Sequence, residues 1–162
     1  MAGQNNKMVD IRQVKQLREE TGVSITECQK ALIEVGGDFE KAKEVLRAWG
    51  KELAEKKKSR ETSQGIIDSY IHLNKKVGVL LELNCETDFV AKSPDFQNLS
   101  HELCLQIAGF SDEAVPLADQ PWIKDESKKI KELINDTIAK IGENISIKRY
   151  VRYSLIKYSN EC

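Results

Sequence analysis

The stretch from residue 77 to residue 92 constrains the fold of this chain more than any other. Apolar side chains alternate through its first half, at Val77, Val79, Leu81, Leu83 and Cys85. This alternation predicts a β-strand with one buried face, because successive side chains of a strand point to opposite sides. The pattern ends at Glu86, where Thr87 or Asp88 can cap a new helical turn. Phe89 follows among polar residues, so it either packs back onto the core or faces a partner.

Capping residues and glycines divide residues 8–50 into three short helical segments. Each segment has apolar residues at helical spacing, a capping residue before it and glycine after it. The caps are Asp10, Ser24 and Asp38, and the terminating glycines are Gly22, Gly36, Gly37 and Gly50. We expect a three-helix N-terminal domain that is close to the smallest size able to fold alone.

Residues 51–64 lose the apolar periodicity and contain the basic run Lys56-Lys57-Lys58. We expect a basic, solvated and partly helical linker between two domains. The alternative is a basic segment that contacts a partner. A direct grip on nucleic acid has little support, since 26 acidic and 25 basic residues give the chain a net charge of −1.

Residues 65–158 predict an α+β core domain. Alternation from Gly65 to Leu73, the turn at residues 74–76 and the strand from Val77 together indicate a β-hairpin. Further expected elements are a helix from Ser93-Pro94 to Gly109, a loop over 110–121, a helix over 125–141 ended by Gly142, and a strand over 145–156. The order β-β-α-α-β predicts a three-stranded antiparallel sheet with helices on one face.

The last strand carries more apolar surface than a core of this size needs. Its apolar side chains include Tyr150, Tyr153, Leu155 and Ile156, and Tyr158 follows. Because a small sheet leaves one face and two edges uncovered, this surplus predicts self-association through the core domain, and a homodimer is the expected form.

The sequence lacks the usual signatures of an active site. It has neither of the glycine-rich loops that hold nucleotide phosphates. A zinc site from Cys85, His101 and Cys104 is conceivable, but the spacing lacks the close ligand pairs of such sites, and a Cys–His nucleophile is less favoured still. We therefore expect a protein that is not an enzyme and that uses no metal or cofactor.

Cysteine usage and hydropathy indicate the compartment. The four cysteines Cys28, Cys85, Cys104 and Cys162 are widely spaced, which favours reduced thiols that serve as small core residues. No apolar run reaches the length of about 18 residues that a membrane span needs. The polar first residues lack the apolar region of a secretory signal. We expect a cytoplasmic protein with no membrane partner.

Two motifs give the chain a specific resemblance. Residues 83–92, Leu-Asn-Cys-Glu-Thr-Asp-Phe-Val-Ala-Lys, resemble the signature of the elongation factor Ts family, the nucleotide-exchange factors of bacterial and organellar translation. Residues 140–145, Lys-Ile-Gly-Glu-Asn-Ile, resemble the second strong motif of that family. Residues 14–22, 28–32 and 37–38 are similar to its ubiquitin-associated-like N-terminal domain.

The resemblance implies a function and a partner. Members of the family bind elongation factor Tu carrying GDP and promote release of the nucleotide. Thr87, Asp88, Phe89 and Val90 would form the loop that disturbs the Mg²⁺ site, with Phe89 as a wedge between helices of the nucleotide-binding domain of elongation factor Tu. Ile141 and Gly142 would make a second contact nearby, and Arg18 on the first helix a third.

The chain also departs from the family pattern. Long members repeat the core fold, whereas this chain has one core, and its connection over residues 110–121 is shorter than expected even of compact members. Contacts made by a second core would have to come from a second copy of this chain, or be lost.

Two rival functions stay open. The three-helix domain alone would suit a ubiquitin-associated-like protein-binding adaptor without exchange activity. A weaker rival is RNA binding by side chains of the last strand, namely Lys148, Arg149, Tyr150 and Arg152.

Overall fold

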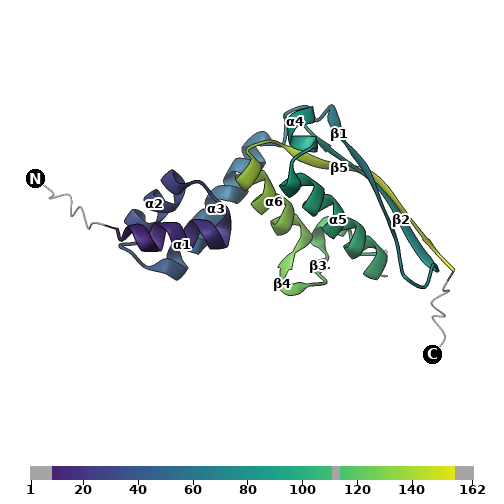
Figure 1. Ribbon diagram of the computed structural model, residues 1–162, viewed down its shortest axis with the longest axis horizontal. Coiled ribbons are helices and arrows are strands. Elements are labelled where there is room, and N and C mark those ends of the chain that lie inside the picture. The colour runs from purple at the N-terminus through teal and green to yellow at the C-terminus, as the bar shows by residue number, and fades with distance from the viewer. Residues whose placement is uncertain (1–8, 111–113, 156–162) are drawn as a thin grey trace, which may run out of the picture.

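The computed structural model describes residues 9–110 and 114–155, which form a helical bundle joined to a mixed helix-and-strand core (Figure 1). The elements are α1 (Ile11–Thr21), α2 (Ile25–Glu34), α3 (Phe39–Lys57), β1 (Gln64–Ile71), β2 (Val77–Cys85), α4 (Asp88–Ala91), α5 (Pro94–Gly109), the 3-10 helix η1 (Leu117–Asp119), β3 (Pro121–Trp122), β4 (Asp125–Lys129), α6 (Ile130–Ile141) and β5 (Ile145–Ser154). The predicted domain boundaries at Met8 and residue 158, and the predicted strand end at Ile156, lie outside the described residues.

Helices α1, α2 and α3 pack around one cluster of buried side chains, and their predicted N-terminal caps are confirmed. The side chains of Asp10, Ser24 and Asp38 each accept a hydrogen bond from a backbone amide in the first turn of the helix that follows. Gly22 ends α1 in the left-handed conformation, with φ of 70°, which glycine adopts without steric cost. The buried side chains of the bundle are Val14, Leu17, Cys28, Ala31, Leu32, Ala42 and Leu46.

The predicted end of the third helix at Gly50 is wrong, because α3 continues to Lys57. Gly50 is buried inside the helix, and a Cβ atom added there would lie 3.1 Å from Cβ of Ala139 on α6. This glycine therefore permits close helix packing and does not terminate a helix. The continuous α3 carries the chain from the bundle directly onto the core, so half of the segment predicted as a linker over 51–64 is helix.

The rest of that segment is also tied to the core. Asn144 is buried, and its side-chain amide donates to the backbone carbonyls of Arg60 at 2.8 Å and Lys58 at 3.5 Å. The ammonium of Lys57 donates to the carbonyl of Gly142 at the end of α6. The prediction of a solvated segment is thus wrong at Lys57, which is buried, whereas Lys58, Ser59 and Arg60 are exposed and attach to the core only through backbone carbonyls and the Arg60 guanidinium.

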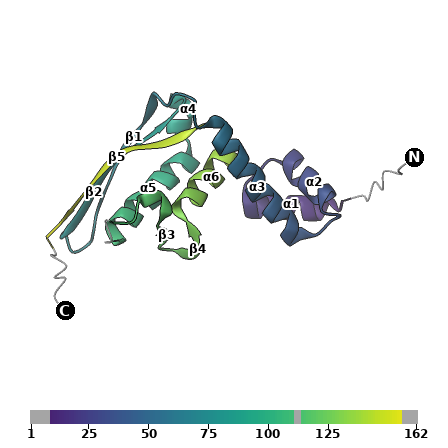
Figure 2. The ribbon, with the colours of Figure 1, turned by 180° about the vertical axis from the view of Figure 1, so that it is seen from behind.

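The three-stranded antiparallel sheet is confirmed, with strand order β1-β2-β5. Strand β2 lies in the centre, and the five residues that alternate from Val77 to Cys85 are all buried. Helix α5 packs on β1 and β2, with α6 beside it on the same face of the sheet (Figure 1 and Figure 2). Fully buried Phe96, Leu103 and Leu81 lie in the core between sheet and helices.

The helix predicted over residues 125–141 starts later, because a short hairpin of β3 and β4 precedes it. Buried Gln106 on α5 holds that hairpin, since its side chain accepts from the amide of Ile123 at 2.9 Å and donates to the carbonyl of Pro121 at 3.0 Å. These contacts outweigh the local helical periodicity before Ile130. None of the helices in residues 9–110 and 114–155 combines the length and the apolar character that crossing a membrane requires.

Candidate partner-binding site

A short, anchored turn presents Phe89 to solvent. Thr87 caps α4, and its hydroxyl accepts from the amide of Val90 at 3.3 Å. Val90 and Ala91 are buried, with 5% and 1% of their surfaces exposed, whereas Phe89 is 84% exposed. Successive helical residues point in different directions, so burying residues 90 and 91 turns Phe89 outward. A large aromatic held in water by a rigid turn is typical of a contact residue.

Asp88 lies beside Phe89 and forms an ion pair with Lys92 one turn later, at 2.5 Å. Both side chains are exposed. Such a pair contributes little to stability in water, so the Asp88 carboxylate can exchange this partner for another without unfolding α4.

The end of α6 lies next to this turn. Gly142 caps α6 with φ of 84°, and its amide donates to the carbonyl of Ile138 at 2.8 Å. The next residue, Glu143, accepts hydrogen bonds from both the amide and the hydroxyl of Thr87, at 3.0 and 2.7 Å. The structure therefore brings together the two predicted contact regions, residues 87–90 and residues 141–142, although more than fifty residues separate them in the chain.

Arg18 is not part of that surface. It is exposed on α1, and α1 belongs to the bundle at one end of the molecule, whereas α4 lies on the core (Figure 1 and Figure 2). A partner that contacts both regions must span the bundle and the core at once.

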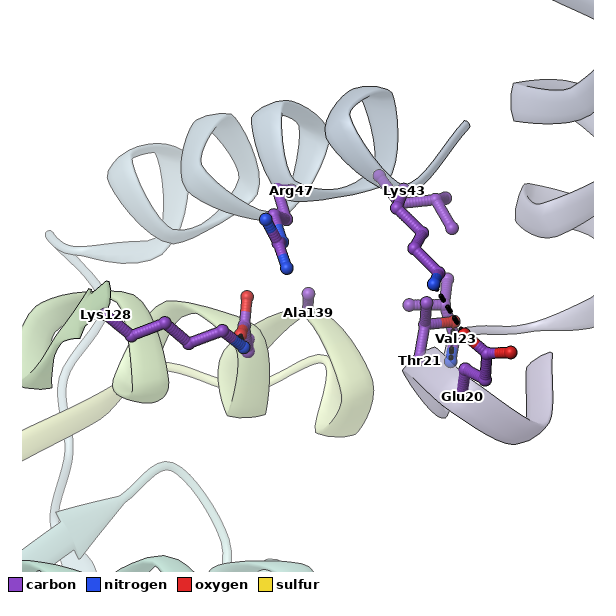
Figure 3. Close-up of a pocket in the computed structure, with 9 residues that line it drawn as sticks. Glu20, Thr21, Val23, Lys43, Arg47, Lys128 and Ala139 are labelled. Atoms are coloured by element: carbon purple, nitrogen blue, oxygen red, sulfur yellow. Dashed lines mark hydrogen bonds and ion pairs between the residues drawn. The ribbon is translucent and has the colours of Figure 1, made fainter. Parts of the chain in front are cut away.

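The junction of bundle and core sets how these regions are spaced. Figure 3 shows the cleft where α3 crosses α6, with Arg47 reaching from α3 toward α6. Within the bundle, Lys43 forms an ion pair with Glu20 at 2.6 Å. On the core side, Lys128 pairs with Asp136 at 3.3 Å. Helix α3 packs on α6 and thereby joins the bundle, which carries Arg18, to the core, which carries Phe89.

Four residues that hold these loops in place are not among the predicted contact residues. Glu86, Glu143 and Asn144 connect the two loops, and Lys57 binds the end of α6. The signal that could have indicated three of them was their place inside the two motifs, next to residues with predicted contacts. Lys57 carried no such signal, because it was one lysine in a basic run.

The cysteines behave as core residues. Burial raises the pKa of the Cys85 thiol to about 11 and that of Cys104 to about 12. The thiolate, which is the form that binds metals and attacks substrates, is therefore disfavoured. His101 is exposed while Cys104 is buried, and no group of three or more candidate ligands in the described part of the chain can hold a metal ion. Cys162 lies outside the described residues.

Comparison with known proteins shows to which family the chain belongs. A family profile described as Elongation factor TS matches residues 86–160, which begin at the turn that carries Phe89 and include the end of α6. Elongation factor Ts of Coprothermobacter proteolyticus is 43% identical to this chain, with 88% of this chain and 95% of that protein aligned. This chain belongs to the elongation factor Ts family.

Other members of the elongation factor Ts family are similarly related. The protein of Thermotoga petrophila is 40% identical over 88% of this chain and 94% of its own length. That of Thermodesulfovibrio yellowstonii is 39% identical over 94% of this chain and 99% of its own length. The alignment with the C. proteolyticus protein runs over 188 positions, more than the 162 residues of this chain, so that elongation factor Ts has residues that this chain lacks.

Proposed function

We propose that this chain is a guanine-nucleotide exchange factor in translation elongation, which binds elongation factor Tu carrying GDP and promotes release of the nucleotide. Membership of the elongation factor Ts family supports this function. The structural observation that supports it best is the exposure of Phe89, 84% of whose surface faces solvent on a turn anchored by buried neighbours.

In this proposal GDP leaves because its Mg²⁺–phosphate site is disturbed. A guanine nucleotide is held mainly by phosphate contacts and by the metal ion, so displacing the metal weakens the grip strongly. If an exchange protein binds the empty partner more tightly than the GDP-loaded partner, it must lower the affinity of the partner for GDP. By linkage, GDP lowers the affinity of the partner for the exchange protein in the same ratio. The exchange factor therefore binds GDP-loaded and empty elongation factor Tu, with no chemical step of its own and no cofactor.

The residues of the turn divide the work. Phe89 enters the partner as an aromatic wedge and Asp88 binds beside it, since both side chains are exposed. Val90 is buried in the free protein and Thr87 caps the helix, so these two hold the turn in place. Ile141 and Gly142 at the end of α6 make the second contact.

The bundle supplies the third region of contact. We propose that it is a ubiquitin-associated-like domain, which its three capped helices and glycine joints support. Arg18 on its first helix approaches the same partner from the far side of the junction. The protein works in the cytoplasm without direct binding to nucleic acid or membrane.

A homodimer is the proposed assembly. The outer face of the sheet, opposite α5, carries exposed apolar side chains at Ile67, Ile71, Leu80, Val151 and Tyr153. Strand pairing sets Leu80 directly opposite Val151. An uncovered apolar sheet face of this kind supports association with a second copy, which would supply contacts that long family members obtain from their repeated core.

Release of fluorescent GDP from elongation factor Tu tests the exchange function. Added protein should accelerate release many-fold, and excess GDP should in turn weaken the complex. Binding without acceleration would favour the adaptor function of the bundle. Acceleration that disappears with a Phe89→Ala change but persists with Glu61→Ala, an exposed control, would support the wedge.

A further inference from the structure

Two carboxylates connect the loop before α4 with the loop after α6, one from each loop. Glu143, after α6, accepts from the amide of Thr87 at 3.0 Å and from its hydroxyl at 2.7 Å. Glu86, before α4, accepts from the amide of Asn144 at 2.7 Å. Each loop thus holds the backbone of the other. Hydrogen bonds to ionised carboxylates are stronger than those between neutral groups.

The hydrogen bonds of Thr87 make the cap of α4 depend on Glu143. A threonine hydroxyl has a single proton. Donating that proton to Glu143 leaves a lone pair to accept the amide of Val90, which lies 3.3 Å away. Without Glu143, Thr87 would lose the two hydrogen bonds that hold its backbone and its side chain, and its oxygen would be held less firmly as the acceptor for Val90.

Helix α4 is too short to hold its own conformation without these hydrogen bonds. It has four residues, Asp88–Ala91, and so short a helix has too few internal hydrogen bonds to outweigh the entropy of nucleation. Phe89 lies in its first turn, with its side chain in solvent. The direction of Phe89 therefore depends on what holds the ends of α4.

Residues at the end of α3 also form hydrogen bonds with these loops. Buried Asn144 binds the carbonyl of Arg60 at 2.8 Å, and Lys57 binds the carbonyl of Gly142. The guanidinium of Arg60 in turn lies 3.6 Å from the carboxylate of Glu86. The end of α3, the residues before α4 and the residues after α6 thus meet at Glu143 and its neighbours. These hydrogen bonds hold the backbone on both sides of Glu143.

We propose that Glu143 is a positioning residue for nucleotide exchange, which holds Thr87 and so fixes the direction of the Phe89 wedge. Its exchange readout rests on the function proposed above. Glu143 acts through Phe89, so its removal should matter only while the wedge is present.

A double-mutant cycle separates this role from direct contact with the partner. Glu143→Ala should slow GDP release from elongation factor Tu by about tenfold, the scale expected for losing hydrogen bonds to a charged group. Glu143→Gln keeps one acceptor oxygen, so its rate of GDP release should lie between those of the wild type and Glu143→Ala. In the Phe89→Ala background, Glu143→Ala should slow release by less than about twofold. An undiminished tenfold effect in that background would overturn the proposal.

A measurement without the partner keeps the proposal testable if the wild-type protein fails to accelerate release, which would refute the proposed function alone. Amide hydrogen exchange of Thr87 and Val90, followed by NMR, should become about tenfold faster in Glu143→Ala, because their hydrogen bonds are loosened. It should stay unchanged in Phe89→Ala and in the surface control Glu61→Ala. Equal protection in the wild type and in Glu143→Ala would overturn the positioning role.

Discussion

Phe89 and Phe96 are seven residues apart in the chain and have opposite surroundings. Phe89 is 84% exposed, whereas Phe96 is completely buried in the core. Changing Phe89 to alanine removes few contacts within the free protein, so the free energy of unfolding should change by less than about 0.5 kcal/mol. Changing Phe96 to alanine leaves a cavity and should lower it by about 3–5 kcal/mol.

For nucleotide exchange the expected effect of Phe89→Ala is large. Burying a phenylalanine side chain from water stabilises a complex by about 1.5–3 kcal/mol, and a central aromatic contact is commonly worth at least about 2 kcal/mol. A loss of about 2 kcal/mol corresponds to roughly 30-fold in rate or affinity. We therefore expect Phe89→Ala to slow GDP release from elongation factor Tu by at least about 30-fold at subsaturating concentrations of the protein.

Two assays check this pair of expectations. Urea unfolding gives the stability of each variant, and stopped-flow release of fluorescent GDP gives the exchange rate. Leu73→Ala serves as a control, because Leu73 is 93% exposed and has no proposed contact. A loss of more than about 1.5 kcal/mol of stability in Phe89→Ala would show that Phe89 packs within the protein. A change in its exchange rate of less than twofold would refute the wedge.

Three further predictions concern packing, pH and assembly. Gly50→Leu should lower the free energy of unfolding in urea by about 1–3 kcal/mol, because even a Cβ atom added at residue 50 would lie 3.1 Å from Cβ of Ala139. Unchanged stability would contradict the close packing of α3 on α6. Stability should fall as pH rises above 9, since unfolded thiols lose their protons near that pH while Cys85 keeps its own until about 11 and Cys104 until about 12; flat stability from pH 9 to 11 in urea titrations would contradict this. Leu80→Lys should convert the proposed dimer to a monomer in light scattering, and a wild-type monomer at working concentration would remove the dimer proposal.

The sequence predicted elements best where local rules were sufficient. The alternation in β2 and the caps at Asp10, Ser24 and Asp38 are short-range patterns, and the structure confirms each of them. Gly50 shows where such rules fail. Glycine commonly follows a helix, but this one is buried against Ala139 and lies inside α3. Only the packing of another helix distinguishes the two roles.

The candidate site was predictable as two motifs but not as one surface. Residues 83–92 and 140–145 carried the family resemblance, yet nothing local indicated that Glu143 would bind Thr87. Hydrogen bonds between residues 56 positions apart depend on where the sheet and α6 place the chain. The network around Lys57 and Asn144 was missed for the same reason.

The stretch from residue 77 to residue 92 divides along the same line. Its residues alone determined that a buried strand runs into a capped turn, because alternation and capping act over a few residues. Its residues could not determine whether Phe89 packs inward or faces solvent. The tertiary structure decided that question, since burial of Val90 and Ala91 against the core leaves Phe89 only the outward direction.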